Sequence, residues 1–129
     1  MNKVCHFEIP IEDRERAKQF YGEVFGWRTE DMPFQDDVYT FAITTPVDEQ
    51  FMYTEKGGIN GGMFKRETPF QGPVVTMEVE SIDAHIPKIE AAGGQLLVPK
   101  GEVPDMGWYA YFRDTEGNVM GLWENLKKA

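Results

Sequence analysis

The 129-residue sequence has little cysteine, little histidine and no cluster of basic side chains. Its single cysteine, Cys5, cannot form an internal disulfide, which is typical of a reducing compartment. Cys5 lies among apolar residues, and this favours a buried thiol over a nucleophile. No apolar run approaches the ~20 residues that span a bilayer, and the first residues do not resemble a signal peptide. These absences predict a cytoplasmic protein that does not enter a membrane.

The charge of the chain excludes another class of partner. A net charge of −9 with scattered Lys and Arg argues against nucleic acid, because phosphate contacts supply most of that affinity. With 41% hydrophobic and 27% charged residues, the composition is ordinary for a globular protein. We therefore expect one domain, or two small halves that share a core.

Hydrophobic periodicity predicts the same order of elements twice. Residues 4–11 form a strand-like run, and acidic residues then precede a helix that ends at Gly26. Ser81 or Asp83 can cap a second helix, which ends at Gly93 and Gly94. The helical stripes comprise Ala17, Phe20, Tyr21, Val24 and Phe25, then Ile82, His85, Ile86 and Ile89. Further strands are expected near residues 27–32, 38–44, 50–55, 58–64, 73–80, 95–99, 108–113 and 118–124.

The two helix ends reveal an internal repeat. Gly26 and Gly94 are offset by 94 − 26 = 68 positions, and the same offset pairs Tyr21 with Ile89. Each half therefore reads as strand, helix and then several strands. A doubly wound parallel sheet needs a helix after nearly every strand, so this order excludes it. The sequence predicts an α+β fold built from two βαβββ modules.

Two motifs give this repeat a family resemblance. The first is Phe-Tyr-x-x-x-Phe-Gly-Trp at residues 20–27, which follows the opening segment 6–13; the second is Asp-x-x-Gly-Asn at residues 114–118. With these motifs the chain resembles the vicinal oxygen chelate superfamily, which includes glyoxalase I, bleomycin-resistance proteins and extradiol dioxygenases. The resemblance covers about residues 3 to 125.

The resemblance implies a single domain over residues 1–129, with module 1 at about 3–66 and module 2 at about 72–125. It also implies a cupped, mostly antiparallel sheet and a homodimer. Metal-dependent members place one ligand on the first strand and one on the last strand of each module. His6 and Glu124 match two of these four positions. The other two fall at Val74 and Phe64, which cannot bind a metal ion.

Two interpretations of His6 and Glu124 therefore stay open. We expect no cofactor, and if the protein is an enzyme they could form a catalytic acid–base pair; the alternative is that they hold a weakly bound divalent metal ion (Zn, Ni, Mn or Fe). Purely structural roles compete with both: a hydrogen-bonded strand histidine and an exposed carboxylate at a strand end. Glu8 shares a strand face with His6 and is a third polar candidate. His85 lies on a predicted helix, where packing is the better explanation.

Aromatic side chains suggest what the site binds. Three Trp, five Tyr and nine Phe in 129 residues could line an apolar pocket for a small organic, aromatic ligand, although core packing explains them slightly better. The leading hypothesis is a small-molecule binder that sequesters its ligand, as bleomycin-resistance proteins do; the alternative is a glyoxalase-like lyase or isomerase. An interaction module is a third possibility. The predicted ligand-binding residues are Glu8, Tyr39, Phe41, Met63, Trp108, Tyr109 and Tyr111.

Overall fold

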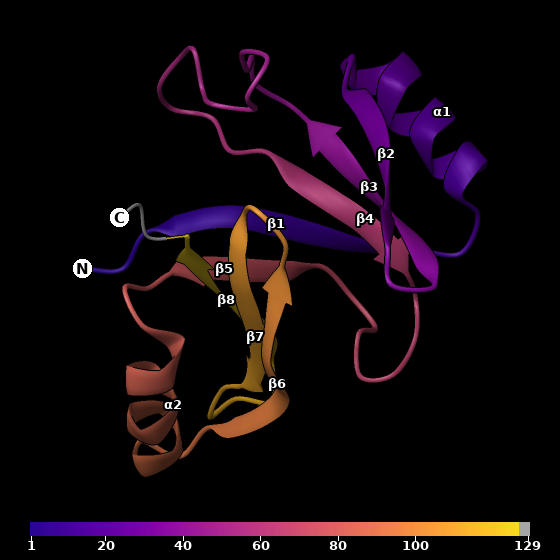
Figure 1. The fold of residues 1–129 in the computed structure, drawn as a ribbon. Coiled ribbons are helices and arrows are strands. Elements are labelled where there is room, and N and C mark those ends of the chain that lie inside the picture. The colour runs from indigo at the N-terminus through magenta and orange to yellow at the C-terminus, as the bar shows by residue number, and fades with distance from the viewer. Residues whose placement is uncertain (127–129) are drawn as a thin grey trace. The chain divides into compact units, whose positions relative to one another are not determined.

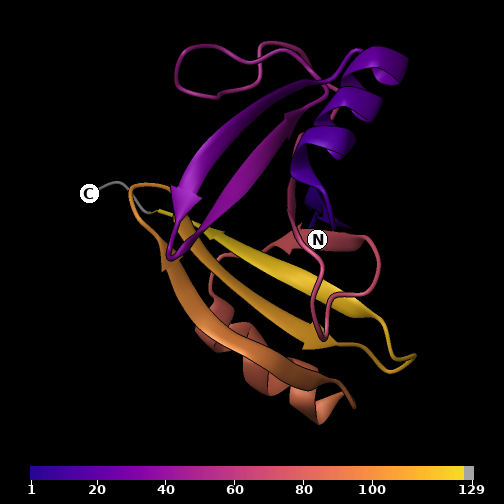
Figure 2. The same ribbon diagram turned by 90° about the vertical axis from the view of Figure 1, so that its right-hand side faces the viewer.

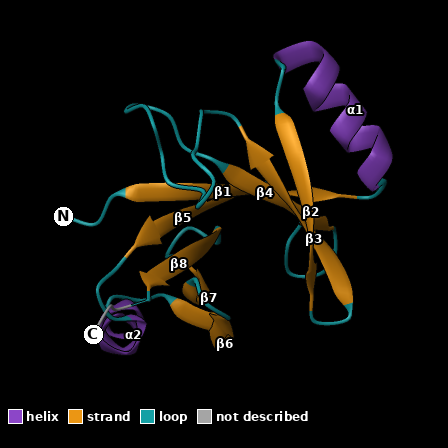
Figure 3. Ribbon diagram, turned by 45° about the horizontal axis from the view of Figure 1, so that its top comes forward, coloured by secondary structure: helices purple, strands orange, loops and turns teal. Residues whose placement is uncertain are grey.

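The computed structural model describes residues 1–126 of the chain. These residues form two compact units, which we call the first module (His6–Pro73) and the second module (74–126 together with Met1–Cys5). None of the helices within the described residues is long and apolar enough to cross a membrane. Each module has one helix on one face of its own strands (Figure 3).

The first module follows the predicted order of elements. It contains β1 (Val4–Ile11, whose first two residues count with the second module), α1 (Arg14–Phe25), β2 (Arg28–Phe34), β3 (Asp37–Ile43) and β4 (Gly61–Lys65). Its strands lie in the order β2-β3-β4-β1. The β2–β3 and β3–β4 pairs are antiparallel, and β1 pairs with β4 in parallel. Helix α1 lies beside β2, β3 and β4 (Figure 1).

The second module repeats this pattern. It contains β5 (Val74–Glu78), α2 (Ile82–Ala91), β6 (Gln95–Val103), β7 (Gly107–Arg113) and β8 (Val119–Asn125). The strand order is β5-β8-β7-β6, and β5 pairs with β8 in parallel. Figure 2 shows β6, β7 and β8 side by side with α2 along them. The α+β prediction of two βαβββ modules with mostly antiparallel pairing is confirmed.

Both helices begin and end as their sequences predict. Asp13 Oδ1 accepts a hydrogen bond from Arg16 N (3.0 Å) at the start of α1, and Ser81 Oγ accepts one from Ala84 N (3.1 Å) at the start of α2. These caps satisfy backbone N–H groups that have no partner inside a helix. Gly26 ends α1 at φ 72°, a left-handed conformation that glycine adopts without strain.

The inner face of α1 is narrower than its periodicity indicates. Ala17 and Tyr21 pack on the module's core, and Tyr21 stacks on Trp27 with ring centroids 4.6 Å apart. The other apolar residues of the predicted stripe are exposed, because only this strip of the helix meets the strands. They are Phe20 (53% exposed), Val24 (58%) and Phe25 (60%).

The strand predicted at residues 50–55 is wrong. This segment belongs to the connection between β3 and β4, where only the bridge between Val47 and Tyr53 has strand-like pairing. Asp48 Oδ1 accepts hydrogen bonds from Gln50 N (2.9 Å) and Met52 N (3.0 Å). These bonds close a turn in place of a strand, because an Asp side chain competes for the same backbone groups.

Candidate functional site

Strand β1 divides its side chains between two chemical environments. Phe7, Ile9 and Ile11 point toward α1 and belong to the apolar core of the first module. Side chains alternate along a strand, so His6 and Glu8 point to the opposite face. We call this surface the His6 face, defined by His6, Glu8, Tyr39 and Phe41.

A chain of hydrogen bonds joins three side chains on the His6 face. The Tyr39 hydroxyl lies 2.8 Å from His6 Nε2 and donates to Glu8 Oε2 at 2.7 Å. Glu8 is buried, with 5% of its surface exposed. A buried carboxylate without a donor is costly, and Tyr39 supplies a donor to this one. We call these three residues the His6–Tyr39–Glu8 relay.

Gly62 makes the relay possible. It lies on β4 between Glu8 of β1 and Phe41 of β3, its partners in the register of the sheet. The Tyr39 side chain crosses over Gly62 to reach Glu8. A Cβ atom on Gly62 would lie 1.9 Å from the Tyr39 hydroxyl oxygen, a distance that no packing adjustment accommodates without moving the ring. Glycine is therefore needed here for close approach.

The relay holds protons that can move. Burial lowers the pKa of His6 below its ordinary value of 6.5, against the opposing effects of Glu8 and the Asn60 carbonyl. The Tyr39 hydroxyl donates to the Glu8 carboxylate, and its oxygen accepts from Nε2–H when His6 is in the imidazolium form. Transfer of one proton from this imidazolium to Glu8 leaves a neutral imidazole and reverses both bonds: Glu8 then donates to Tyr39, and Tyr39 donates to Nε2. The arrangement is therefore suited to general acid–base chemistry.

Glu124 has a different environment in the second module. It is 6% exposed and lies on the same face of β8 as Leu122, which packs in the core beneath α2. Its Oε1 accepts a hydrogen bond from Ile82 N (2.8 Å), the first residue of α2, and lies 3.7 Å from Lys100 Nζ. An acid at this position satisfies a helix N-terminus. The structure thus gives Glu124 a role in the fold, buried rather than exposed at a strand end.

The other predicted ligand-binding residues divide between the faces of their strands. Met63 is fully buried in the core of the first module, because alternation turns it away from the His6 face. Trp108 packs against the core of the second module, where Lys100 Nζ lies 5.1 Å from its ring centroid. Tyr109 and Tyr111 point to the opposite face of β7, away from α2, with ring centroids 6.0 Å apart. Of the predicted residues, the first module brings together His6, Glu8, Tyr39 and Phe41.

The residues present do not form a metal centre within either module. No group of three or more His, Cys, Asp or Glu side chains comes together within either module of the described chain, residues 1–126. The two metal-binding atoms of the relay, His6 Nε2 and Glu8 Oε2, contact the Tyr39 hydroxyl, and Glu124 Oε1 is bound to a backbone N–H. In a metal site, hydrogen bonds from neighbouring groups orient the ligand atoms toward the ion. Here the hydrogen bonds are made to the ligand atoms themselves.

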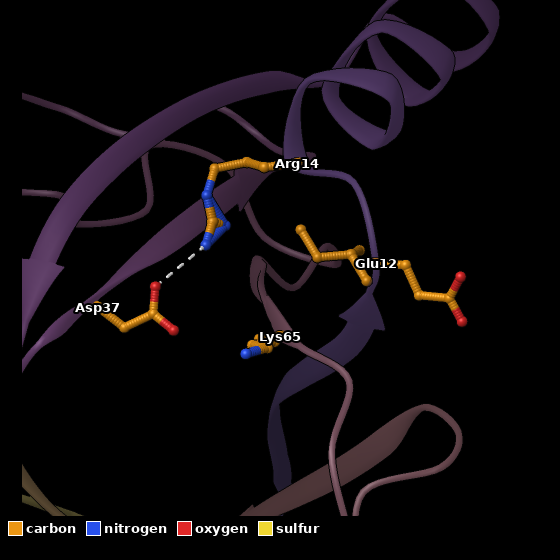
Figure 4. Close-up of a pocket in the computed structure, with 5 residues that line it drawn as sticks. Glu12, Arg14, Asp37 and Lys65 are labelled. Atoms are coloured by element: carbon orange, nitrogen blue, oxygen red, sulfur yellow. Dashed lines mark ion pairs between the residues drawn. The ribbon is translucent and has the colours of Figure 1, made fainter.

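Two concave regions of the first module lie outside the His6 face. The smaller, of 160 Å³, is lined by charged side chains of both signs (Figure 4). There Arg14 donates to Val38 O (2.8 Å) and lies 3.8 Å from Asp37, so it fastens the start of α1 to β3. The larger, of 510 Å³, lies along α1. The smaller is lined by Ile11, Glu12, Arg14, Asp37 and Lys65; the larger includes Pro10, Arg16, Phe20, Tyr21 and Arg66.

Sequence reasoning missed the bridging role of Tyr39. It identified Tyr39 only as an aromatic side chain, although the His-x-Glu pattern on one strand face signals two polar groups that need a shared partner. The glycine at position 62 was the other signal, since a glycine within a strand often marks a close approach.

Comparisons with known proteins agree with this fold. Residues 3–40 match the family described as "Bleomycin resistance protein-like N-terminal". A "Glyoxylase-like domain-containing protein" of Didymella fabae is 30% identical over 125 residues, which cover 93% of this chain and 91% of that protein. "Putative glyoxylase CFP32" of Mycobacterium tuberculosis is 27% identical over 119 residues; the match covers 91% of this chain but only 43% of the mycobacterial protein.

A solved structure shares the fold at lower identity. A variant of Streptomyces coelicolor methylmalonyl-CoA epimerase in complex with 2-nitronate-propionyl-CoA has a TM-score of 0.70 and 13% identity, with 98% of this chain and 99% of that chain covered. The paired βαβββ modules thus define a glyoxalase-like and epimerase-like class of fold. The chain belongs to the vicinal oxygen chelate superfamily.

Proposed function

We propose that this protein binds a small organic molecule on the His6 face of its first module, with the His6–Tyr39–Glu8 relay as the polar anchor. The observation that supports the proposal is the buried Glu8 carboxylate, joined at 2.7 Å to a tyrosine that also contacts His6. Binding sites typically combine an apolar lining with a few placed polar groups. Phe41 supplies apolar surface beside the relay, with its ring centroid 5.5 Å from that of Tyr39.

Chemically, the ligand should carry a hydroxyl or carbonyl oxygen on a planar body. Such an oxygen exchanges hydrogen bonds with the relay, and the planar body packs on the aromatic rings. Sequestration of this ligand is the function that the arrangement supports best. In this proposal the protein needs no cofactor and acts as a homodimer. A weakly bound divalent ion is the alternative, and elemental analysis of protein purified without chelator tests it. One metal ion per chain, lost in His6→Ala, would favour the alternative.

The binding proposal is tested by titrating 3-hydroxyquinoline into ¹⁵N-labelled protein. The hydroxyl of this probe can meet the relay, and its ring system is planar. We expect amide shifts on β1 and β3 that saturate, and about tenfold weaker binding in Tyr39→Phe, because the relay loses its central hydroxyl. Shifts confined to other elements, or equal affinity of the variant, would refute the proposed anchor.

A second candidate, a lyase or isomerase, is favoured by the proton chemistry of the relay. The lowered pKa of His6 leaves a neutral imidazole at pH 7 that can accept a proton. The epimerase neighbour suggests methylmalonyl-CoA as a first substrate to assay. Incubation in D₂O would show deuterium at the acidic carbon of the thioester if the protein is an enzyme of this kind. The exchange should be lost in Glu8→Gln; exchange that survives in this variant would exclude the relay as its cause.

A further inference from the structure

The connection between β3 and β4, residues 44–60, presents apolar side chains to solvent although it is a well-fastened loop. Asn60 Oδ1 accepts hydrogen bonds from Thr44 N (2.8 Å) and Thr45 N (2.9 Å), and Asn60 N donates to the Tyr53 hydroxyl (2.8 Å). The exposed residues are Phe51 (42%), Met52 (63%), Tyr53 (47%) and Ile59 (37%). Several exposed apolar side chains on one loop call for an explanation, whereas a single one does not.

Phe51 is held in an unfavourable backbone conformation. Its φ of 61° lies in the left-handed region, which a bulky residue rarely adopts. Asp48 maintains this conformation, because its carbonyl accepts from Phe51 N (3.0 Å) and its N–H donates to Met52 O (2.9 Å). The strain positions a ring that stays 42% exposed, so the fold buries only part of its apolar surface in return. Strain of this kind concentrates at functional sites.

The Phe51 ring extends a row of aromatic side chains that starts at the relay. The centroid of Phe51 lies 5.6 Å from that of Phe41, which lies 5.5 Å from that of Tyr39. Tyr39 in turn contacts His6 and Glu8. A ligand whose oxygen meets the relay would therefore lay its remaining atoms along Phe41 toward Phe51.

We propose that Phe41 and Phe51 form an apolar subsite for the planar part of the ligand, and that Phe51 determines specificity for flat, uncharged ring systems. This inference rests on the proposed binding function of the His6 face. Charge supports it: the loop carries Asp48, Glu49 and Glu55 against Lys56, and Glu30 lies opposite Phe41 in the register of the sheet. A carboxylated ring is disfavoured by these acids, whereas a neutral ring is not.

The experiment compares quinoline, quinoline-2-carboxylate and 3-hydroxyquinoline as probes in ¹H–¹⁵N titrations. In the wild-type protein we expect quinoline to shift the amides of Phe41 and Phe51, and the carboxylated analogue to bind more weakly. Phe51→Asn should weaken quinoline binding by about fivefold, since the ring is lost. It should leave the urea midpoint unchanged or raised, because Asn tolerates the left-handed conformation.

Gln35→Asn is the matched control. Gln35 is exposed, has φ 56° and lies in the turn between β2 and β3. The control therefore relieves the same kind of backbone strain away from the proposed subsite. It should leave quinoline affinity unchanged. The subsite is overturned if quinoline does not shift the Phe41 and Phe51 amides, if Phe51→Asn binds quinoline as the wild type does, or if that variant unfolds at a clearly lower urea concentration.

The third probe separates the subsite from the anchor. In the wild type, 3-hydroxyquinoline should bind more tightly than quinoline, and Tyr39→Phe should abolish this gain while keeping quinoline binding. Suppose that Phe51→Asn loses quinoline binding but the wild type binds 3-hydroxyquinoline no more tightly than quinoline. This result would support the subsite and refute the relay as anchor. A hydroxyl gain with no effect of Phe51→Asn would refute the subsite alone.

Discussion

Glu8 and Glu124 are buried carboxylates on strands, one in each module, with 5% and 6% of their surfaces exposed. Their hydrogen-bond partners differ in kind. Glu8 Oε2 accepts from the Tyr39 hydroxyl, which also contacts His6, whereas Glu124 Oε1 accepts from the backbone N–H of Ile82. The difference follows from strand alternation, because Glu8 points away from α1 and Glu124 points toward α2. Burial alone therefore does not separate a candidate site carboxylate from one that serves the fold; its hydrogen-bond partners make the difference.

The largest effect is expected from removing the carboxylate that serves the fold. Glu124→Ala leaves the Ile82 N–H without its acceptor in a buried site and should lower the free energy of unfolding by about 3 kcal/mol. The measurement is urea denaturation followed by circular dichroism. Asp83→Ala is the control, because Asp83 also contacts Lys100 but is exposed. This variant should lower the free energy of unfolding by less than about 1 kcal/mol. Equal stability of Glu124→Ala and wild type would contradict the structural role.

The next effect comes from displacing the relay without touching its members. Gly62→Ala places a methyl group where the Tyr39 hydroxyl lies and should cost about 1–3 kcal/mol of stability. It should also weaken 3-hydroxyquinoline binding, because Tyr39 can no longer bridge His6 and Glu8. Gly72→Ala is the matched control, since no atom lies within 4 Å of its added Cβ. If both variants bind alike, the close approach over Gly62 has no part in the site.

A smaller effect distinguishes the relay by its pH dependence. In the unfolded chain His6 titrates near 6.5, and in the folded protein burial lowers its pKa. Between the two values the unfolded state binds more protons, so stability is full above pH 6.5 and falls as the pH drops below it, by at most about 1.4 kcal/mol per pH unit. His6→Gln should remove this contribution when unfolding is measured from pH 8 to pH 5. Parallel pH profiles of variant and wild type would mean that the His6 pKa is not lowered.

The last effect is on reactivity and not on stability, and it concerns the residue before His6, which points to the other face of β1. Burial, with the nearby Glu78 carboxylate, raises the pKa of the Cys5 thiol from 9.0 to about 11. The folded protein should therefore react with Ellman's reagent about 100-fold more slowly than the urea-unfolded chain, since the thiolate is the reactive form. Rapid reaction of the folded protein, absent in Cys5→Ser, would show that this part of β1 is more open than the structure indicates.

Much of the fold could be predicted from the sequence because its signals are local. The caps at Asp13 and Ser81 and the glycine after α1 depend on neighbouring residues alone, and the 68-residue offset carried them from one module to the other. The exposed Phe20 and the missing strand at 50–55 were not predictable in this way. Both depend on which surface the strands cover and on the competing hydrogen bonds of Asp48.

The candidate site could be predicted only in part. Alternation correctly placed His6 and Glu8 on one face, but it cannot tell which face of β8 carries Glu124 until the position of α2 is known. Tyr39 is 31 positions from Glu8 and 33 positions from His6 in the chain. Such a link depends on the strand register and on the absent side chain at Gly62, which periodicity does not encode.

The most direct test of the account measures 3-hydroxyquinoline affinity in two variants, Glu8→Gln and Glu124→Gln. Each substitution keeps the shape of the side chain and removes its charge. We expect Glu8→Gln to weaken binding by about tenfold and Glu124→Gln to bind as the wild type does, whatever stability it loses. Normal binding by Glu8→Gln with loss in Glu124→Gln would contradict the assignment of the ligand to the His6 face.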